Sequence, residues 1–64
     1  MKRRDLMKQL DAEAKRQGLV VEIVREGGSH TIVRIGDRQT TVPRHSEINE
    51  MTARSILKQM GVSR

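Results

Sequence analysis

The sequence predicts a small two-layer α+β domain in which two helices cover one face of a three-stranded antiparallel sheet. Apolar residues recur at helical spacing near both ends of the chain. Between these regions the apolar period changes to two, and two glycine-containing turns divide the middle into three short runs. Two amphipathic helices packed on such a sheet leave its other face open. We expect one domain spanning residues 1–64.

The composition limits the kind of site that this chain can form. A domain of 64 residues buries only about 60% of the surface that its unfolded chain exposes, so we expect a shallow, surface-facing site. The sequence contains no aromatic residue and no cysteine, which excludes disulfides and thiolate metal sites. The absence of cysteine suits a reducing compartment such as the cytoplasm. No apolar run is long enough to span a bilayer.

The charge balance points to a polyanionic partner. Thirteen Lys and Arg residues stand against eight Asp and Glu residues, which gives a net charge of +5 and a sequence pI near 10.8. For a domain of this size, such an excess favours binding to nucleic acid. A membrane surface is disfavoured because neither predicted helix combines a basic face with a large apolar one.

The first helix is predicted over residues 3–16. Its apolar residues form one stripe at helical period: Leu6, Met7, Leu10 and Ala14. Lys15 and Arg16 complement the negative end of the helix dipole, and Gly18 suits the left-handed position that follows a helix.

The first strand is predicted from Leu19 to about Glu26. Leu19, Val21 and Ile23 alternate with the other side chains, so we expect them to form one buried face. Gly27-Gly28 follows as a turn, and we expect positive φ at both glycines because tight hairpins require it.

The second strand is predicted over residues 29–35 and the third over Arg38–Val42. Gly36-Asp37 forms the turn between them, and Pro43 ends the third strand. Neither face of the second strand is purely polar, so the pattern leaves open which face meets the core. One of these faces carries His30, Ile32 and Arg34.

A loop over residues 43–47 leads into the second helix. Asn49 is a good N-cap residue, and Gly61 suits the end of the helix. The apolar positions between them have the clearest helical spacing in the chain: Ala53, Ile56, Leu57 and Met60.

The chemistry that remains after elimination is proton transfer by histidine. The two histidines and the scattered carboxylates match no metal-ligand spacing, and phosphate-loop and nucleophile-elbow motifs are absent from the sequence. Ser29 and His30 are adjacent on the predicted strand and would point to opposite faces. RNA cleavage needs proton transfer at the 2′-hydroxyl and at the leaving oxygen, with cations on the phosphate. His30 suits this role, but a histidine at a strand start is also a common surface residue.

Three ordered motifs resemble the HicA toxin family. They are Gly28-Ser29-His30 before a β-branched strand, Thr41-Val42-Pro43-Arg44-His45, and the closing helix with its glycine over residues 52–62. The resemblance spans nearly the whole chain. It implies a fold like that of double-stranded-RNA-binding domains, mRNA interferase activity in a toxin–antitoxin system, and His30 as the catalytic histidine.

We therefore expect a metal-independent endoribonuclease that uses His30 as a general acid or base and needs no cofactor. The expected partners are mRNA and, from the resemblance, a HicB-like antitoxin protein, with no membrane and no small-molecule cofactor. The resemblance also points to His45, with a role in RNA contact or in loop structure. The expected RNA-binding residues are Gly28, Ser29, Arg25, Arg34, Arg44, His45 and Lys58.

Two alternatives of other classes stay open at this point. One is a non-catalytic RNA-binding module on the same fold, which would shift RNA in a gel without producing fragments. The other is a small DNA-binding regulator. It is disfavoured because the two predicted helices are separated by the whole sheet and form no helix-turn-helix pair.

Overall fold

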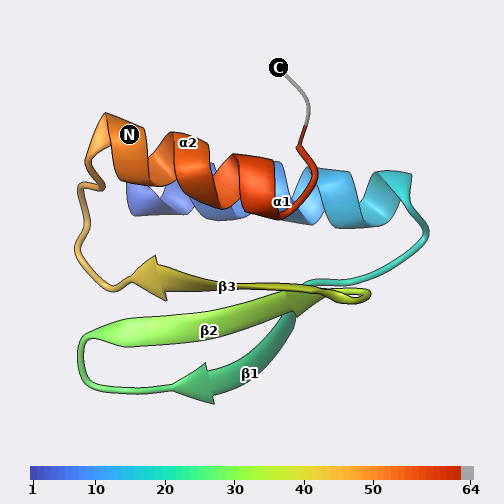
Figure 1. Cartoon of the computed structure of the whole chain (residues 1–64), viewed down its shortest axis with the longest axis horizontal. Coiled ribbons are helices and arrows are strands. Elements are labelled where there is room, and N and C mark those ends of the chain that lie inside the picture. Colours follow the sequence, from blue (N-terminus) through green and yellow to red (C-terminus); the bar gives the residue numbers. More distant parts are fainter. Residues whose placement is uncertain (63–64) are drawn as a thin grey trace.

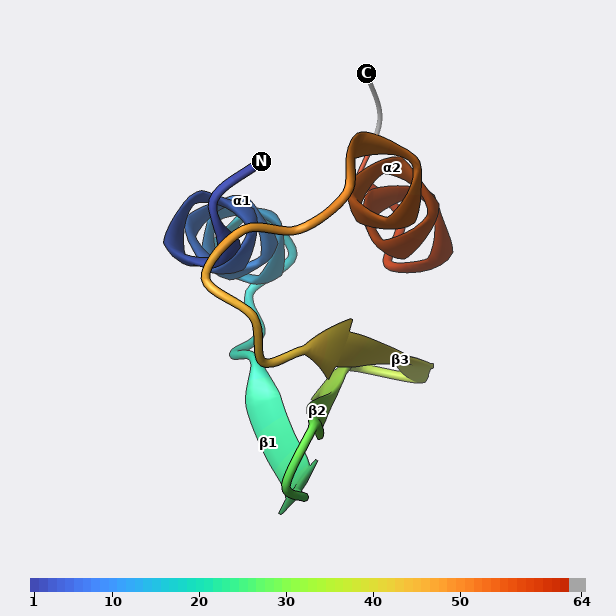
Figure 2. The same cartoon turned by 90° about the vertical axis from the view of Figure 1, so that its left-hand side faces the viewer.

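The computed structural model describes residues 1–62 and has the predicted α-β-β-β-α order (Figure 1). The elements are α1 (Arg3–Arg16), β1 (Glu22–Glu26), β2 (His30–Ile35), β3 (Arg38–Pro43) and α2 (Glu50–Gln59). The three strands form one antiparallel sheet in the order β1-β2-β3. Both helices lie side by side on the same face of this sheet (Figure 2). Within residues 1–62, neither helix has the length and apolar character needed to cross a membrane.

The predicted helix ends are confirmed. Gly18 follows α1 with φ of +75°, and Gly61 follows α2 with φ of +82°, a left-handed conformation that glycine adopts without strain. At the start of α2, Asn49 Oδ1 accepts a hydrogen bond from the backbone N–H of Met51 at 2.8 Å.

The core shows which face of the sheet is covered. Thr31, Val33 and Ile35 of β2 are buried, whereas His30 is exposed. The apolar core joins this face of the sheet to both helices through Leu6, Leu10, Ala14, Val33, Ile35, Val42, Ile48, Ala53, Ile56, Leu57 and Met60. The face that carries His30, Ile32 and Arg34 is therefore the open one.

The predicted buried face of β1 is wrong. The strand begins at Glu22, and all five of its residues are exposed. Leu19 is 41% exposed and Ile23 is 50% exposed, while Val21 is partly buried against the core. The physical reason is the position of β1: it is an edge strand that twists away from the helical layer (Figure 2), so the helices do not cover it.

A β-bulge in β1 changes the face on which Arg25 lies. Ile23 pairs with Val33, but the next pair along the ladder is Arg25 with Ile32, so Val24 is an extra residue in β1. Because residues paired across an antiparallel ladder share a face, Arg25 lies on the open face. A regular strand would have placed Val24 opposite Ile32 and turned Arg25 to the covered face.

The turn before β2 also differs from its prediction. Neither Gly27 nor Gly28 has positive φ. The Gly27 N–H donates to the His30 carbonyl oxygen at 2.8 Å, and the Gly27 carbonyl accepts from the Arg44 side chain. The Arg44 side chain thus supports a turn that lacks the mirror-image backbone of a tight two-residue hairpin.

The remaining differences concern single residues at strand ends. Ser29 lies in the turn rather than in β2, so the predicted opposition of Ser29 and His30 on one strand does not apply. Its carbonyl oxygen accepts from the Arg44 backbone N–H at 3.0 Å. Strand β3 includes Pro43, which an edge strand tolerates because that position needs no N–H in the ladder.

Candidate functional site

His30 lines a shallow pocket of about 300 Å³ on the open face of the sheet. Four of the predicted site residues meet there: Arg25, Gly28, Ser29 and His30. The rest of the lining consists of Gly27, Ile32 and Thr41. A basic side chain, an imidazole and a glycine turn are thus brought together on a surface that no other element covers.

The strand register explains how the pocket forms. Ile32 pairs with Arg25 on one side and with Thr41 on the other. Directly opposed side chains lie on one face with Cβ atoms about 4.5–5.5 Å apart, so these three form a row across the sheet. His30 is two residues from Ile32 on the same strand and shares its face. Thr41 was not predicted as a site residue, although an antiparallel pairing of the second and third runs would have placed it opposite Ile32.

Arg44 supports the turn that precedes His30. Its Nη1 donates to the Gly27 carbonyl oxygen at 2.8 Å and lies 3.9 Å from Glu26 Oε1. Its backbone N–H donates to the Ser29 carbonyl oxygen. These contacts join the end of β3 to the turn. Arg44 therefore stabilises one side of the pocket without lining it.

Arg3 fixes the start of α1 to both strands at the His30 end of the sheet. Its Nε donates to the Pro43 carbonyl oxygen at 3.0 Å, and its Nη2 donates to Thr31 Oγ1 at 3.2 Å. Pro43 is the cross-strand partner of His30, and Thr31 is the next residue along β2. One signal for this contact is present in the sequence: a threonine in the inward-facing row of β2 needs a polar partner from elsewhere.

A family model described as "HicA toxin of bacterial toxin-antitoxin" matches residues 4–62. The chain belongs to the HicA toxin family. The match covers all three strands, the second helix and all but the first residue of α1. Neither the curated proteins nor the solved structures contain a match to it. As a HicA toxin, the protein is one half of a toxin–antitoxin pair whose other half is a HicB-type antitoxin.

Three of the predicted RNA-binding residues of the toxin lie apart from the His30 pocket. Arg34 lies further along β2, and its Nε and Nη2 both donate to Glu22 Oε1, at 3.1 and 3.0 Å. Lys58 belongs to α2, on the covered side of the sheet, where it lines a separate hollow with Arg54. His45 is exposed in the loop after β3, outside the pocket lining.

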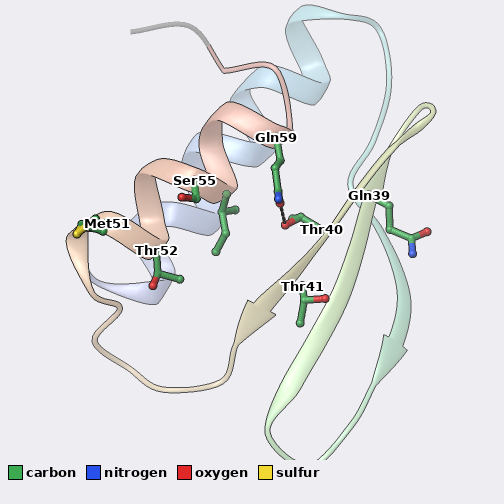
Figure 3. A pocket seen from close by; sticks show the side chains of 8 residues that line it. Gln39, Thr40, Thr41, Met51, Thr52, Ser55 and Gln59 are labelled. Atoms are coloured by element: carbon green, nitrogen blue, oxygen red, sulfur yellow. Dashed lines mark hydrogen bonds between the residues drawn. The ribbon is translucent and has the colours of Figure 1, made fainter.

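Another hollow of the toxin lies between β3 and α2 and has a volume of about 520 Å³ (Figure 3). Hydroxyl and amide side chains dominate it, and Thr40 Oγ1 donates to Gln59 Oε1 across it. Its lining contains neither a histidine nor a charged side chain, so it offers no proton-transfer group. Within residues 1–62, no three His, Asp or Glu side chains gather closely enough to hold a metal ion.

Proposed function

We propose that this HicA toxin is an mRNA interferase, an endoribonuclease in which His30 transfers a proton during cleavage of the phosphodiester bond. One observation supports this most strongly: the pocket on the open face combines His30 with Arg25 and the backbone of a glycine turn. An imidazole titrates near neutral pH, and a guanidinium offers a planar fork that matches two phosphate oxygens.

The reaction follows from the chemistry of RNA. The 2′-oxygen attacks the adjacent phosphorus as its hydroxyl loses a proton, and the bond from phosphorus to the 5′-oxygen breaks as that oxygen gains a proton. The products are a 2′,3′-cyclic phosphate and a 5′-hydroxyl. His30 performs one of these proton transfers, a role that is worth about 10²–10⁴ in rate. Arg25 stabilises the negative charge that develops on the non-bridging oxygens.

The composition of the pocket predicts weak sequence selectivity. The chain has no aromatic residue, so bases cannot stack on Phe, Tyr or Trp as they do in most sequence-specific RNA-binding modules. Only the imidazole of His30 and the guanidinium of Arg25 offer planes for stacking in this pocket. We expect the substrate to be a single strand whose backbone can bend into the open pocket.

A His30→Ala protein tests the proposal, with His45→Ala as the matched control outside the pocket. We expect His30→Ala to cleave RNA about 10²–10⁴ times more slowly and to lose the growth arrest of the parent. The His45→Ala protein loses an expected RNA contact but no residue of the pocket, so it should bind RNA more weakly and still cleave it far faster than His30→Ala. Mass spectrometry of the parent's fragments should find 2′,3′-cyclic phosphate ends.

A specific outcome would favour the non-catalytic alternative. If the parent shifts RNA in a gel without producing fragments, and His30→Ala shifts it equally well, the toxin is a binding module. If the parent produces fragments and His30→Ala does so at the same rate, another group performs the chemistry and the role of His30 is wrong. Circular dichroism of each variant establishes that it is folded.

A further inference from the structure

We propose that the RNA strand continues from the His30 pocket into a second cleft, where Lys2, Arg3, Arg4 and Arg44 bind the phosphates that flank the scissile one. The proposal rests on the ribonuclease function above and extends it from the reacting phosphate to its neighbours. The cleft, called the cationic cleft below, has a volume of about 490 Å³ and is lined by these four residues and Ser46.

The lining of the cationic cleft is unusual for this molecule. Four of the thirteen Lys and Arg residues of the chain gather there, and its lining includes no acidic and no apolar side chain. A concave surface made of guanidinium and ammonium groups suits a chain of phosphates, because each cation that neutralises a phosphate also releases a bound counterion from the nucleic acid.

Two of the four cations are held in place before any ligand binds. Arg3 uses Nε and Nη2 for its contacts to Pro43 and Thr31, and a guanidinium has five N–H donors, so others remain for a ligand. Arg44 is fixed by its hydrogen bond to the Gly27 carbonyl oxygen. Binding to fixed donors costs less side-chain entropy than binding to mobile ones.

The other two cations are more exposed, and the nearby acids do not neutralise the cleft. Lys2 Nζ lies 3.7 Å from Glu47 Oε1, and Arg44 Nη1 lies 3.9 Å from Glu26 Oε1. Within residues 1–62, the Arg4 side chain is exposed and has no ion pair. Four cations against two acids leave a positive surplus for an anion.

The helix dipole does not account for the position of these charges. Lys2, Arg3 and Arg4 lie at the N-terminal end of α1, where the helix dipole disfavours cations by about 0.3–1 kcal/mol each. Lys2 is also the N-cap residue and makes no side-chain capping hydrogen bond. A bound anion removes this repulsion, so the placement agrees with a binding role.

The cationic cleft adjoins the His30 pocket. Arg44 lines the cleft and donates to the carbonyl oxygen of Gly27, a residue that lines the pocket. Arg3 holds the carbonyl oxygen of Pro43, the strand partner of His30. Both sites therefore adjoin the same end of the sheet. A strand whose scissile phosphate lies at His30 can place its next phosphates among the four cations.

Binding of a 2′-O-methyl RNA oligonucleotide, which cannot be cleaved by this chemistry, tests the proposal over a series of salt concentrations. The test protein carries Lys2→Ala and Arg4→Ala. Its matched control carries Lys8→Ala and Lys15→Ala, which remove the same charge from exposed positions of α1 outside the cleft. For single strands, log affinity decreases with log salt, and the magnitude of this slope is about 0.7 for each phosphate contact. We expect this magnitude to decrease by about 1.4 in the test protein and to stay near that of the parent in the control.

Equal affinities and equal salt slopes for the test protein and the control would overturn the proposal that the cationic cleft binds RNA phosphates. So would a test protein that binds the oligonucleotide normally but loses the antitoxin, because the cleft would then serve the protein partner. The proposed ribonuclease function fails by a different result, namely a folded parent that leaves unmodified RNA intact. A thermal melt of both double variants establishes that each is folded.

Discussion

Arg44 Nη1 donates a hydrogen bond to the Gly27 carbonyl oxygen at 2.8 Å, and this contact joins the loop after β3 to the turn that precedes His30. Two backbone hydrogen bonds also hold the turn. The Gly27 N–H donates to the His30 carbonyl oxygen, and the Arg44 N–H donates to the Ser29 carbonyl oxygen. A side chain beyond the sheet thus helps to place the proposed catalytic histidine.

The Arg44→Ala substitution is expected to loosen the turn and slow RNA cleavage. Loss of one hydrogen bond lowers the free energy of unfolding by about 0.5–1.5 kcal/mol. Amide hydrogen exchange at Gly27, whose N–H donates to the His30 carbonyl oxygen, should become faster. A role of Arg44 limited to phosphate contact would not produce this change. If exchange at Gly27 is unchanged while cleavage falls, Arg44 contacts RNA and does not position the turn.

Deletion of Val24 is expected to leave Arg25 on the open face. Without the extra residue Ile23 and Arg25 become adjacent, and they keep their partners Val33 and Ile32 in a regular ladder. RNA cleavage by the deletion protein should therefore stay well above that of Arg25→Ala. Circular dichroism should show a folded protein because β1 contributes little to the core. Cleavage as slow as that of Arg25→Ala would contradict this register.

The Leu10→Ala substitution is expected to remove much of the stability of the toxin. Leu10 is completely buried. Truncation of such a leucine to alanine lowers the free energy of unfolding by about 2–5 kcal/mol. The whole free energy of unfolding of a domain of this size is only about 3–10 kcal/mol. Val20→Ala is the control, because Val20 is 77% exposed and its truncation should cost at most about 0.5 kcal/mol. Urea unfolding measures both, and similar midpoints for the two variants would contradict the core described above.

The Glu13 carboxylate is expected to make the stability of the toxin depend on acid pH. Hydrogen bonds from Arg16 and then from Gln17 lower the pKa of Glu13 below its ordinary value of 4.5. The ionised form is therefore favoured in the folded state. Its contribution is fully present above pH 4.5 and is lost as the pH falls through the lowered pKa.

Thermal melts of the parent and of Glu13→Gln measure this effect. The parent should have the higher Tm at pH 7, and the difference should shrink as the pH falls below 4.5. A difference that stays constant down to pH 2 would show that Glu13 acts through packing rather than through its charge.

The HicB-type partner is expected to present an acidic surface to the toxin. A net charge of +5 favours a complementary negative surface and electrostatically steered association. The association rate constant should fall steeply as salt rises, while the dissociation rate changes less. Stopped-flow mixing over a salt series measures both, and a flat association rate would contradict the acidic surface.

The element order and the helix ends could be predicted because each depends on local chemistry. The spacing of Leu6, Leu10 and Ala14 and the cap at Asn49 need no information from distant residues. The face of β2 that meets the core could not be predicted, because Ile32 and Val33 are equally apolar and only the docking of the helices separates them.

The candidate site was predicted in part. Arg25, Gly28, Ser29 and His30 share one pocket, yet the placement of Arg25 depends on a bulge that no pattern in the first strand reveals. The alternation of apolar residues in that strand predicted burial, but burial depends on whether a helix lies above it. Arg3 was missed because its contacts to Thr31 and Pro43 cross most of the chain.

The division of the sheet into a covered and an open face has a consequence for the evolution of this toxin. The side chains that hold the fold together point one way from β2, and those that form the proposed site point the other. Substitutions on the open face can therefore accumulate without a packing penalty. A lineage can alter the proposed RNA-binding pocket, or escape one antitoxin and acquire another, while the scaffold beneath stays the same.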